Sequence, residues 1–276
     1  MRKAIDFLKA HPLITGIIGV AIGVVATRVF RLDTIWKIAF LRIVLTMAMS
    51  MFVYLISREK SFENCHTTTG YVVKWGILTV IPELILLLGS VFLVIKGESV
   101  VAAGWQLRAL FAVVAVVFVG LFEELTFRAM INDALLYSFR NNKHIFIWIA
   151  IISSLVFGSV HVISASIFTD SQALLLAVLK ALSACLGGFC WLILYWKTRN
   201  IWGIALIHGL CDFGTFLLPA LTENKADLGG VENYTKIGAI GNGIYLFQIV
   251  FSLIAVIILW NKVGKTIDFE EIRKNW

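Results

Sequence analysis

Long apolar runs alternate with short polar breaks along most of the chain. An α-helix needs about 20 apolar residues to cross the roughly 30 Å hydrocarbon core of a membrane. Eight runs meet or approach that length: 13–30, 35–57, 71–95, 100–122, 145–168, 173–196, 201–219 and 241–261. The pattern therefore predicts an all-α polytopic membrane protein, a bundle of about eight transmembrane helices. The fourth run is followed by an amphipathic stretch that would extend its helix past residue 122.

The composition agrees with this prediction. Hydrophobic residues make up 59% of the chain and charged residues 15%, whereas soluble domains average about 45–50% and about 25%. These values exclude an ordinary soluble enzyme, a disordered chain and a nucleic-acid-binding module. Without repeats or long hydrophilic inserts, residues 1–276 form a single membrane domain. We divide it into N-terminal helices without a motif (1–99), motif-bearing helices (100–220), and the last loop, last helix and tail (221–276).

The basic residues predict the orientation of the bundle. The net charge is +7, and cytoplasmic loops of membrane proteins carry an excess of Lys and Arg. An N-terminus inside the cell places eleven loop and tail residues on the cytoplasmic side: Arg58, Lys60, Lys74, Arg140, Lys143, Lys197, Arg199, Lys262, Lys265, Arg273 and Lys274. We therefore expect a multi-pass protein of the cell membrane with both termini cytoplasmic.

Two weaker patterns lie within the apolar runs. Isolated charges at membrane depth are costly, and pairing, for example of Arg42 with Glu83, or snorkelling to the interface accounts for them. Gly19 and Gly23 form a GxxxG pair in the first run. Such a pair indicates close helix packing, either inside the bundle or in a dimer.

The segment FEELTFR, residues 122–128, places two carboxylates directly after a long apolar run. Arg128 follows Glu124 by four residues, so the two side chains face each other on a helix in the favourable order. Glu123 points about 100° away from that pair. This division predicts that Glu124 is held by arginine and that Glu123 is left to do chemistry.

Two further polar motifs lie in later apolar runs. The first, FGSVH, ends in His161, and the second, HGLCD, places His208 and Asp212 one helical turn apart. Two histidines on different spans, with a glutamate pair and an aspartate, are hard to explain as packing. A carboxylate or imidazole that takes a proton from water, and a polar group that stabilises an oxyanion, are what hydrolysis inside a membrane requires.

The ordered set EExxxR, FxxxH and HxxxD on separate apolar helices, from Glu123 to Asp212, resembles the CPBP family of intramembrane proteases. This family is also called Abi and is related to the type II CAAX prenyl endopeptidases. The resemblance implies an intramembrane endopeptidase that hydrolyses a peptide bond of a membrane-associated or lipid-modified peptide. Its expected partners are that peptide or protein substrate and the lipid bilayer, with no nucleic acid.

The resemblance also implies roles for individual residues. Glu123 is the catalytic glutamate, and Glu124 is its neighbour held by Arg128. His161 acts with Glu123 on water, while His208 and Asp212 form the oxyanion or ligand side. Phe157 is a packing residue of the second motif. The prenyl endopeptidases have asparagine where this chain has Asp212. Because an ionised aspartate cannot donate to an oxyanion, Asp212 is either protonated or acts by orienting His208.

Several alternatives remain open at this stage. We favour chemistry without a cofactor, but Glu123, His161 and His208 are also a donor set for catalytic zinc. Cys211, near His208, is a minor candidate for a thiol nucleophile. A non-enzymatic bacteriocin-immunity or membrane partner protein, or a small transporter, would also place charges in the membrane.

The predicted topology leaves one difficulty. At 1.5 Å per residue, His161 lies about 24 Å from the start of its span and His208 only about 10 Å from the start of its own. If both helices begin at the cytoplasmic surface, the histidines lie at different depths. Tilted helices, an extended fourth helix or a sunken turn at 140–144 would bring them together.

Overall fold

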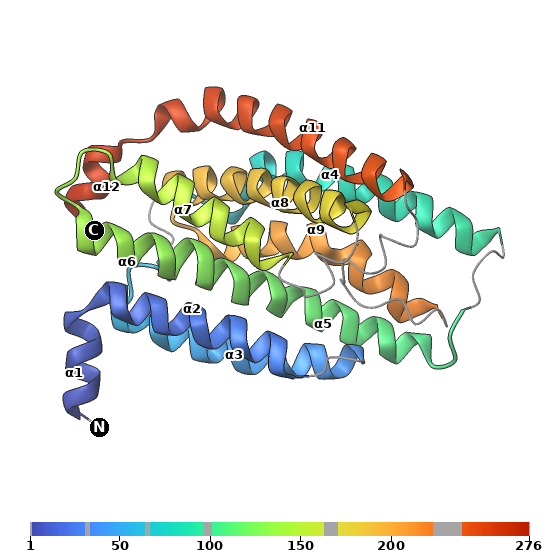
Figure 1. Cartoon of the computed structure of the whole chain (residues 1–276), viewed down its shortest axis with the longest axis horizontal. Coiled ribbons are helices and arrows are strands. Elements are labelled where there is room, and N and C mark those ends of the chain that lie inside the picture. The colour runs from blue at the N-terminus through green and yellow to red at the C-terminus, as the bar shows by residue number, and fades with distance from the viewer. Residues whose placement is uncertain are drawn as a thin grey trace.

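A computed structural model describes residues 2–30, 34–63, 67–96, 101–162, 171–222 and 239–275. These residues form helices and connecting turns, with no β-strand beyond an isolated bridge between Val101 and Thr222. The longer helices run roughly side by side in one elongated bundle (Figure 1). Their bounds are α1 Arg2–Ala10, α2 Pro12–Val29, α3 Ile35–Ser57, α4 Thr69–Ile95, α5 Trp105–Glu124, η1 Leu125–Ile131, α6 Asn132–Phe139, α7 Ile145–Val160, α8 Ser171–Thr198, α9 Ile201–Leu221, α11 Ala239–Lys262, η3 Gly264–Thr266 and α12 Phe269–Asn275.

An apolar helix lies at each of the eight predicted runs, but not all are long enough to cross a membrane. Six described helices are, and the bent pair α1–α2 makes up to seven. The all-α polytopic fold is thus confirmed, whereas the count of eight spans is not. The exception is α7, whose 16 residues extend only about 24 Å.

The last turn of α7 explains its length. The His161 amide donates to the Gly158 carbonyl and the Val162 amide to the Ser159 carbonyl, so the helix tightens into three-residue steps and stops. The predicted span at 145–168 is thus an α-helix from Ile145 to Val160. Its residues 163–168 lie outside the described part of the chain, as does most of the loop in the predicted segment 221–276.

The fourth apolar run continues well past residue 122, as predicted. Helices α5, η1 and α6 form one apolar segment of 35 residues, Trp105–Phe139. Its middle part, η1, is a π-helix that begins directly after Glu124. Single π-helical turns inside α-helices are rare and frequently occur at functional sites. The glutamate pair therefore lies near the middle of this segment and not at its end.

Both chain ends lie at one end of the bundle (Figure 1). There the Lys60 ammonium donates to the Asn275 carbonyl at 2.6 Å, and the Lys197 ammonium donates to the Thr266 carbonyl at 2.8 Å. Basic residues from separate parts of the chain are thus gathered around the C-terminal segment. At the same end α1 is bent by 107° from α2, and its apolar and charged residues fall on opposite faces. A short amphipathic helix that is bent away from the bundle in this way is suited to lie on a membrane surface.

The GxxxG pair packs inside the bundle. A Cβ atom added to Gly19 would lie 2.3 Å from the Met130 sulfur, and one added to Gly23 would lie 3.1 Å from the Phe122 ring. Both glycines are buried, so α2 uses them to approach α3, α5 and η1. Of the two alternatives left open by the sequence, the structure supports packing within one chain.

Two further glycines bring α5 and α9 into backbone contact. A Cβ atom at Gly120 would lie 2.4 Å from the Ala205 carbonyl oxygen, and one at Gly209 would lie 2.9 Å from the Val116 carbonyl oxygen. No side chain fits at either position without separating the helices. This antiparallel contact places the glutamate pair of α5 beside the histidine of α9.

The turn between α8 and α9 is buried. Thr198 and Asn200 are fully inaccessible and Arg199 is 3% exposed, which is unusual because turns normally lie at the surface. Several of its polar groups are bonded inside the bundle. The Asn200 side chain accepts from the Gly203 amide and caps α9, and an Arg199 guanidinium nitrogen lies 3.3 Å from an Asp133 oxygen. Arg199 therefore lies between two helices, as the sequence predicts, but in a turn that is buried and not at the surface.

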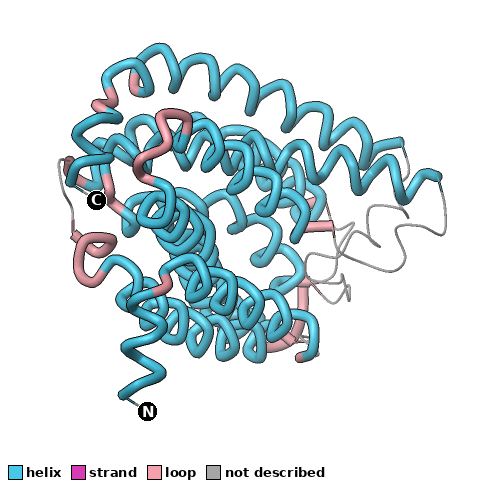
Figure 2. The backbone as a smooth tube through the Cα atoms, turned by 60° about the vertical axis from the view of Figure 1, so that its left-hand side comes forward, coloured by secondary structure: helices cyan, strands magenta, loops and turns pink. Residues whose placement is uncertain are grey.

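The tube representation shows how the helices surround the centre of the bundle (Figure 2). Residues of α3, α5, η1, α7, α8 and α9 contribute to one large core of buried apolar side chains. Polar residues lie within this core at two places. One is the Arg199–Asp133 pair, and the other is the cavity that contains the predicted site residues.

Candidate active site

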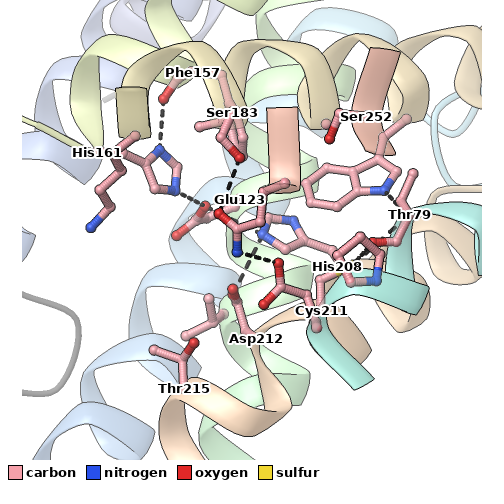
Figure 3. Close-up of a pocket in the computed structure, with 18 of the residues that line it drawn as sticks. Thr79, Glu123, Phe157, His161, Ser183, His208, Cys211, Asp212, Thr215 and Ser252 are labelled. Carbon is pink, nitrogen blue, oxygen red and sulfur yellow. Dashed lines mark hydrogen bonds and ion pairs between the residues drawn. The ribbon is translucent and has the colours of Figure 1, made fainter. Parts of the chain in front are cut away.

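A cavity of about 290 Å³ lies between α3, α4, α5, α7, α8, α9 and α11. Seven charged or imidazole side chains line it: Arg42, Glu83, Glu123, His161, Lys180, His208 and Asp212. Four of them are site residues predicted from the sequence, and Figure 3 shows Glu123, His161, His208 and Asp212 converging from α5, the end of α7 and α9. The structure therefore brings the three motifs together.

The Glu123 carboxylate lies between the two histidines. Its Oε2 atom is 3.7 Å from His161 Nε2 and 3.6 Å from His208 Nε2. It makes no hydrogen bond with any group among the described residues. These separations exceed hydrogen-bond length, and polar contacts of this length are commonly bridged by water. Arg42 of α3 lies 3.7 Å from the other oxygen, so a cation contacts one side of the carboxylate while the opposite side faces the histidines.

Glu124 and Arg128 form a fully buried ion pair, as the i,i+4 spacing predicts. Arg128 Nε lies 3.2 Å from Glu124 Oε2, with the two side chains 1% and 0% exposed. The guanidinium also lies over the rings of Phe157 at 4.2 Å and Trp191 at 5.2 Å. Such cation–π contacts stabilise a guanidinium group that is buried away from solvent.

His208 is fixed on three sides. Its Nδ1 lies 2.6 Å from Glu124 Oε1, and its ring stacks on Trp191 with centroids 4.2 Å apart. Because a carboxylate only accepts, Nδ1 carries the hydrogen of that bond. Its Nε2 consequently faces the cavity, where Asp212 Oδ2 is 3.5 Å away. Glu124 thus orients His208 in addition to pairing with arginine, a role that the sequence did not indicate.

His161 faces Glu123 from the end of α7. Its Nδ1 lies 2.7 Å from the Phe157 carbonyl oxygen, and because a carbonyl only accepts, Nδ1 is the donor. In a neutral imidazole this leaves Nε2 without a hydrogen, as an acceptor directed at the cavity. Phe157 is 2% exposed and packs against His161, His208 and Trp191. It is the packing residue that the resemblance implied.

The contacts of Arg42 and Cys211 differ from those suggested by the sequence. Arg42 lies against Glu123, whereas Glu83, the partner suggested for it, accepts a hydrogen bond from Gln248. The Cys211 thiol donates to the Thr79 carbonyl at 3.5 Å. Its hydrogen bond is thus directed at α4.

The depth difficulty is resolved by two features of the fold. The turn at 140–144, which was one candidate for a sunken turn, is exposed, whereas the turn at 198–200 is buried. Helix α9 therefore begins inside the bundle, which moves His208 deeper than its position in the helix suggests. Side chains tilt toward the N-terminus of their own helix, so in the antiparallel pair α5–α9 Glu124 and His208 lean toward each other.

Several residues of this site were not found from the sequence. Trp191 supports both His208 and Arg128, yet one more tryptophan in an apolar run carries no distinguishing signal. Arg42 was noticed only as an isolated charge. Gly120 and Gly209 set the contact between α5 and α9. In the sequence, the only signal of this role is that they lie close to the glutamate pair and to His208.

The fold and the site together define a class: a polytopic all-α membrane protein whose helices enclose a glutamate–histidine centre. The family model described as type II CAAX prenyl endopeptidase Rce1-like matches residues 104–214. This segment contains all three motifs, and the match confirms the resemblance recognised from them. It covers less than half of the chain. No match was found among curated proteins or among solved structures.

Two imidazoles and a carboxylate are suitable donor types for zinc. Within the described residues, however, no group of three His, Cys, Asp or Glu side chains is arranged to hold one metal ion. Both histidine Nε2 atoms lie 3.6–3.7 Å from one Glu123 oxygen, a spacing at which a water molecule commonly bridges two polar groups.

Proposed function

We propose that the protein is an intramembrane endopeptidase in which Glu123 and His161 activate a water molecule for attack on a peptide bond. One observation carries this proposal: a buried carboxylate oxygen without a hydrogen bond faces two imidazoles at 3.6 and 3.7 Å, on the wall of a cavity. The family match at residues 104–214 supports the same class of reaction. The substrate is a membrane-associated or lipid-modified peptide.

The first step is removal of a proton from water. Glu123 Oε2 and, in neutral His161, Nε2 are both acceptors, so a water molecule between them donates both of its hydrogens. Its oxygen lone pairs then point into the cavity, toward a substrate carbonyl. General-base assistance of this kind contributes about 10²- to 10⁴-fold to a rate, and enclosure away from bulk water strengthens the electrostatic interactions of the site.

The second step is stabilisation of the oxyanion. We assign it to His208, whose Nδ1 bonds Glu124 and whose Nε2 faces the cavity beside Asp212. An imidazolium held between carboxylates donates from Nε2 to the developing negative charge. Asp212 orients this ring, and Arg128 balances the charge of Glu124. Asp212 and Arg128 are therefore positioning residues.

Proton return completes the reaction. The proton taken by Glu123 passes to the nitrogen of the leaving peptide as the carbon–nitrogen bond breaks, which leaves a carboxylic acid and an amine and restores the carboxylate. The same group thus acts as base and then as acid.

We also propose that both termini face the cytoplasm. The N- and C-terminal segments lie at one end of the bundle, together with basic residues such as Lys60 and Lys197 (Figure 1), and cytoplasmic surfaces are enriched in Lys and Arg. A reporter that fluoresces only in the cytoplasm, fused to the C-terminus, is expected to fluoresce. A dark but full-length fusion would reverse the orientation.

The test of the proposed activity is a comparison of peptide termini in cells that express the wild-type protein or Glu123→Gln. We expect new N- and C-termini only with the wild-type protein, and these identify the substrate. If both proteins give the same termini and the variant preserves every effect of the wild type, the protein is a binding or immunity protein and not a peptidase.

A further inference from the structure

Glu83 of α4 differs from the other acidic residues of the described spans. Each of the other four lies within 4 Å of a basic or imidazole side chain: Glu123 near Arg42, Glu124 near Arg128, Asp133 near Arg199, and Asp212 near His208. No ion pair among the described residues includes Glu83. A carboxylate at membrane depth without a cation is costly, which makes it a candidate for function.

The Glu83 side chain is held in a defined orientation. Gln248 Nε2 of α11 donates to Glu83 Oε1 at 2.6 Å, and Ser183 Oγ of α8 donates to Gln248 Oε1 at 3.3 Å. The serine hydroxyl thereby fixes which end of the amide faces Glu83. Three helices cooperate to keep the carboxylate as an acceptor on the cavity wall. A residue that only snorkels toward the interface would not need such support.

Glu83 and Glu123 line the same cavity. Glu83 follows Pro82, a proline in the interior of α4, where the missing amide hydrogen interrupts the regular helix. The predicted chemical residues lie within the matched segment 104–214, whereas Glu83 and Gln248 lie outside it. One wall thus carries the hydrolytic groups, and the wall formed by α4 and α11 belongs to the remainder of the chain.

We propose that Glu83, oriented by Gln248 and Ser183, forms a subsite for a lysine or arginine side chain of the peptide substrate. The inference rests on the proposed peptidase function and adds a specificity to it. An ammonium or guanidinium group supplied by the substrate offsets the buried carboxylate through a charge-assisted hydrogen bond. A basic residue bound at Glu83 holds a nearby peptide bond in the cavity that contains Glu123.

The experiment uses the purified full-length protein in liposomes and a set of peptides in which one lysine is moved along the sequence. Each peptide is paired with one that has norleucine at the same position. We expect one position where lysine raises kcat/KM by roughly 10- to 100-fold over norleucine, the size typical of a hydrogen bond to a charged group. In Glu83→Gln this ratio falls close to one, because the isosteric amide keeps the bond to Gln248 but has no charge.

Two further variants make the result specific. Glu83→Asp keeps the charge and is expected to restore part of the lysine preference, which loss of folding would not allow. Glu271→Gln removes an exposed carboxylate of α12 and should leave the ratio at its wild-type value. A wild-type enzyme without a lysine preference at any position, or one whose preference survives in Glu83→Gln, overturns the proposal.

A binding measurement separates this inference from the proposed function. The same peptide pairs are titrated against protein that carries Glu123→Gln, with and without Glu83→Gln. Tighter binding of the lysine peptide that depends on Glu83 supports the subsite, even if the wild-type protein cleaves nothing and the peptidase proposal fails. Cleavage that depends on Glu123 but shows no effect of Glu83 in either assay rejects the subsite alone.

Discussion

The bundle buries charged residues in two clusters that differ in what their carboxylates contact. In the first, Asp133 is fully satisfied: one oxygen accepts from Asn132 and Arg199, and the other accepts from Ser61. In the second, one oxygen of Glu123 accepts no hydrogen bond and faces a cavity. Both carboxylates lie within the same continuous segment, Trp105–Phe139.

This difference shows that a buried charge in a membrane span does not by itself identify a reactive site. The Asp133 cluster joins the end of α3, α6 and the buried turn before α9, and it supplies the partners that this turn requires. The Glu123 cluster holds its second carboxylate, Glu124, by His208 and Arg128, yet leaves the first one accessible to a ligand. Function is therefore expected where the polar groups are incompletely satisfied beside a cavity.

The largest expected effect comes from Glu123→Gln. The amide has nearly the same shape but cannot take a proton, so cleavage of the substrate found by terminus profiling should fall by about 10²- to 10⁴-fold. The unfolding free energy, measured by titration with SDS and circular dichroism, should change by less than about 1 kcal/mol. A stable variant with full activity would remove Glu123 from the mechanism.

Asp133→Ala should show the opposite pattern. Loss of one partner of a buried ion pair typically costs about 3–5 kcal/mol, so we expect a large fall in the unfolding free energy by the same titration. The matched control is Glu59→Gln, an exposed acidic residue in the turn after α3, which should remain within about 0.5 kcal/mol of wild type. Equal stabilities of the two variants would contradict a structural role for Asp133.

Gly120→Ala tests whether the α5–α9 contact sets the geometry of the active site. The added methyl group would meet the Ala205 carbonyl at 2.4 Å, so the helices must separate, at a cost of about 1–3 kcal/mol. Activity should fall together with stability because Glu124 and His208 move apart. In Gly89→Ala, where the methyl group meets no atom within 4 Å, both quantities should be preserved.

Metal content tests whether Glu123 activates water without a metal ion. We expect elemental analysis of the purified protein to find no stoichiometric zinc, in the wild type or in His161→Ala. Zinc at one ion per chain in the wild type, lost in the variant, would replace direct activation of water by Glu123 with a metal-dependent mechanism.

The smallest effect is expected for Cys211→Ser. The thiol lines the cavity but donates to the Thr79 carbonyl, and a serine hydroxyl can make the same bond. Cleavage by this variant should remain near the wild-type rate in the assay used for Glu123→Gln. A loss as large as that of Glu123→Gln would indicate a thiol nucleophile.

Two contacts of the candidate site could be predicted from the sequence because their signals are local. The spacing of Glu124 and Arg128 predicts their ion pair on any helix, and the structure confirms it. The spacing of His208 and Asp212 likewise places both on one face, where they lie 3.5 Å apart. Polar residues in apolar runs are conspicuous because burial in a membrane is costly.

By itself the sequence determined that the chain is an all-α membrane protein, where its apolar helices lie, and which polar residues need an explanation. Only the tertiary structure decided that the turn before α9 is sunken, that α7 stops at Val160, and that Glu124 orients His208. Hydropathy and spacing report on residues a few positions apart. These other features depend on contacts between helices distant in the sequence, such as Gly120 against Ala205, and no local pattern encodes them.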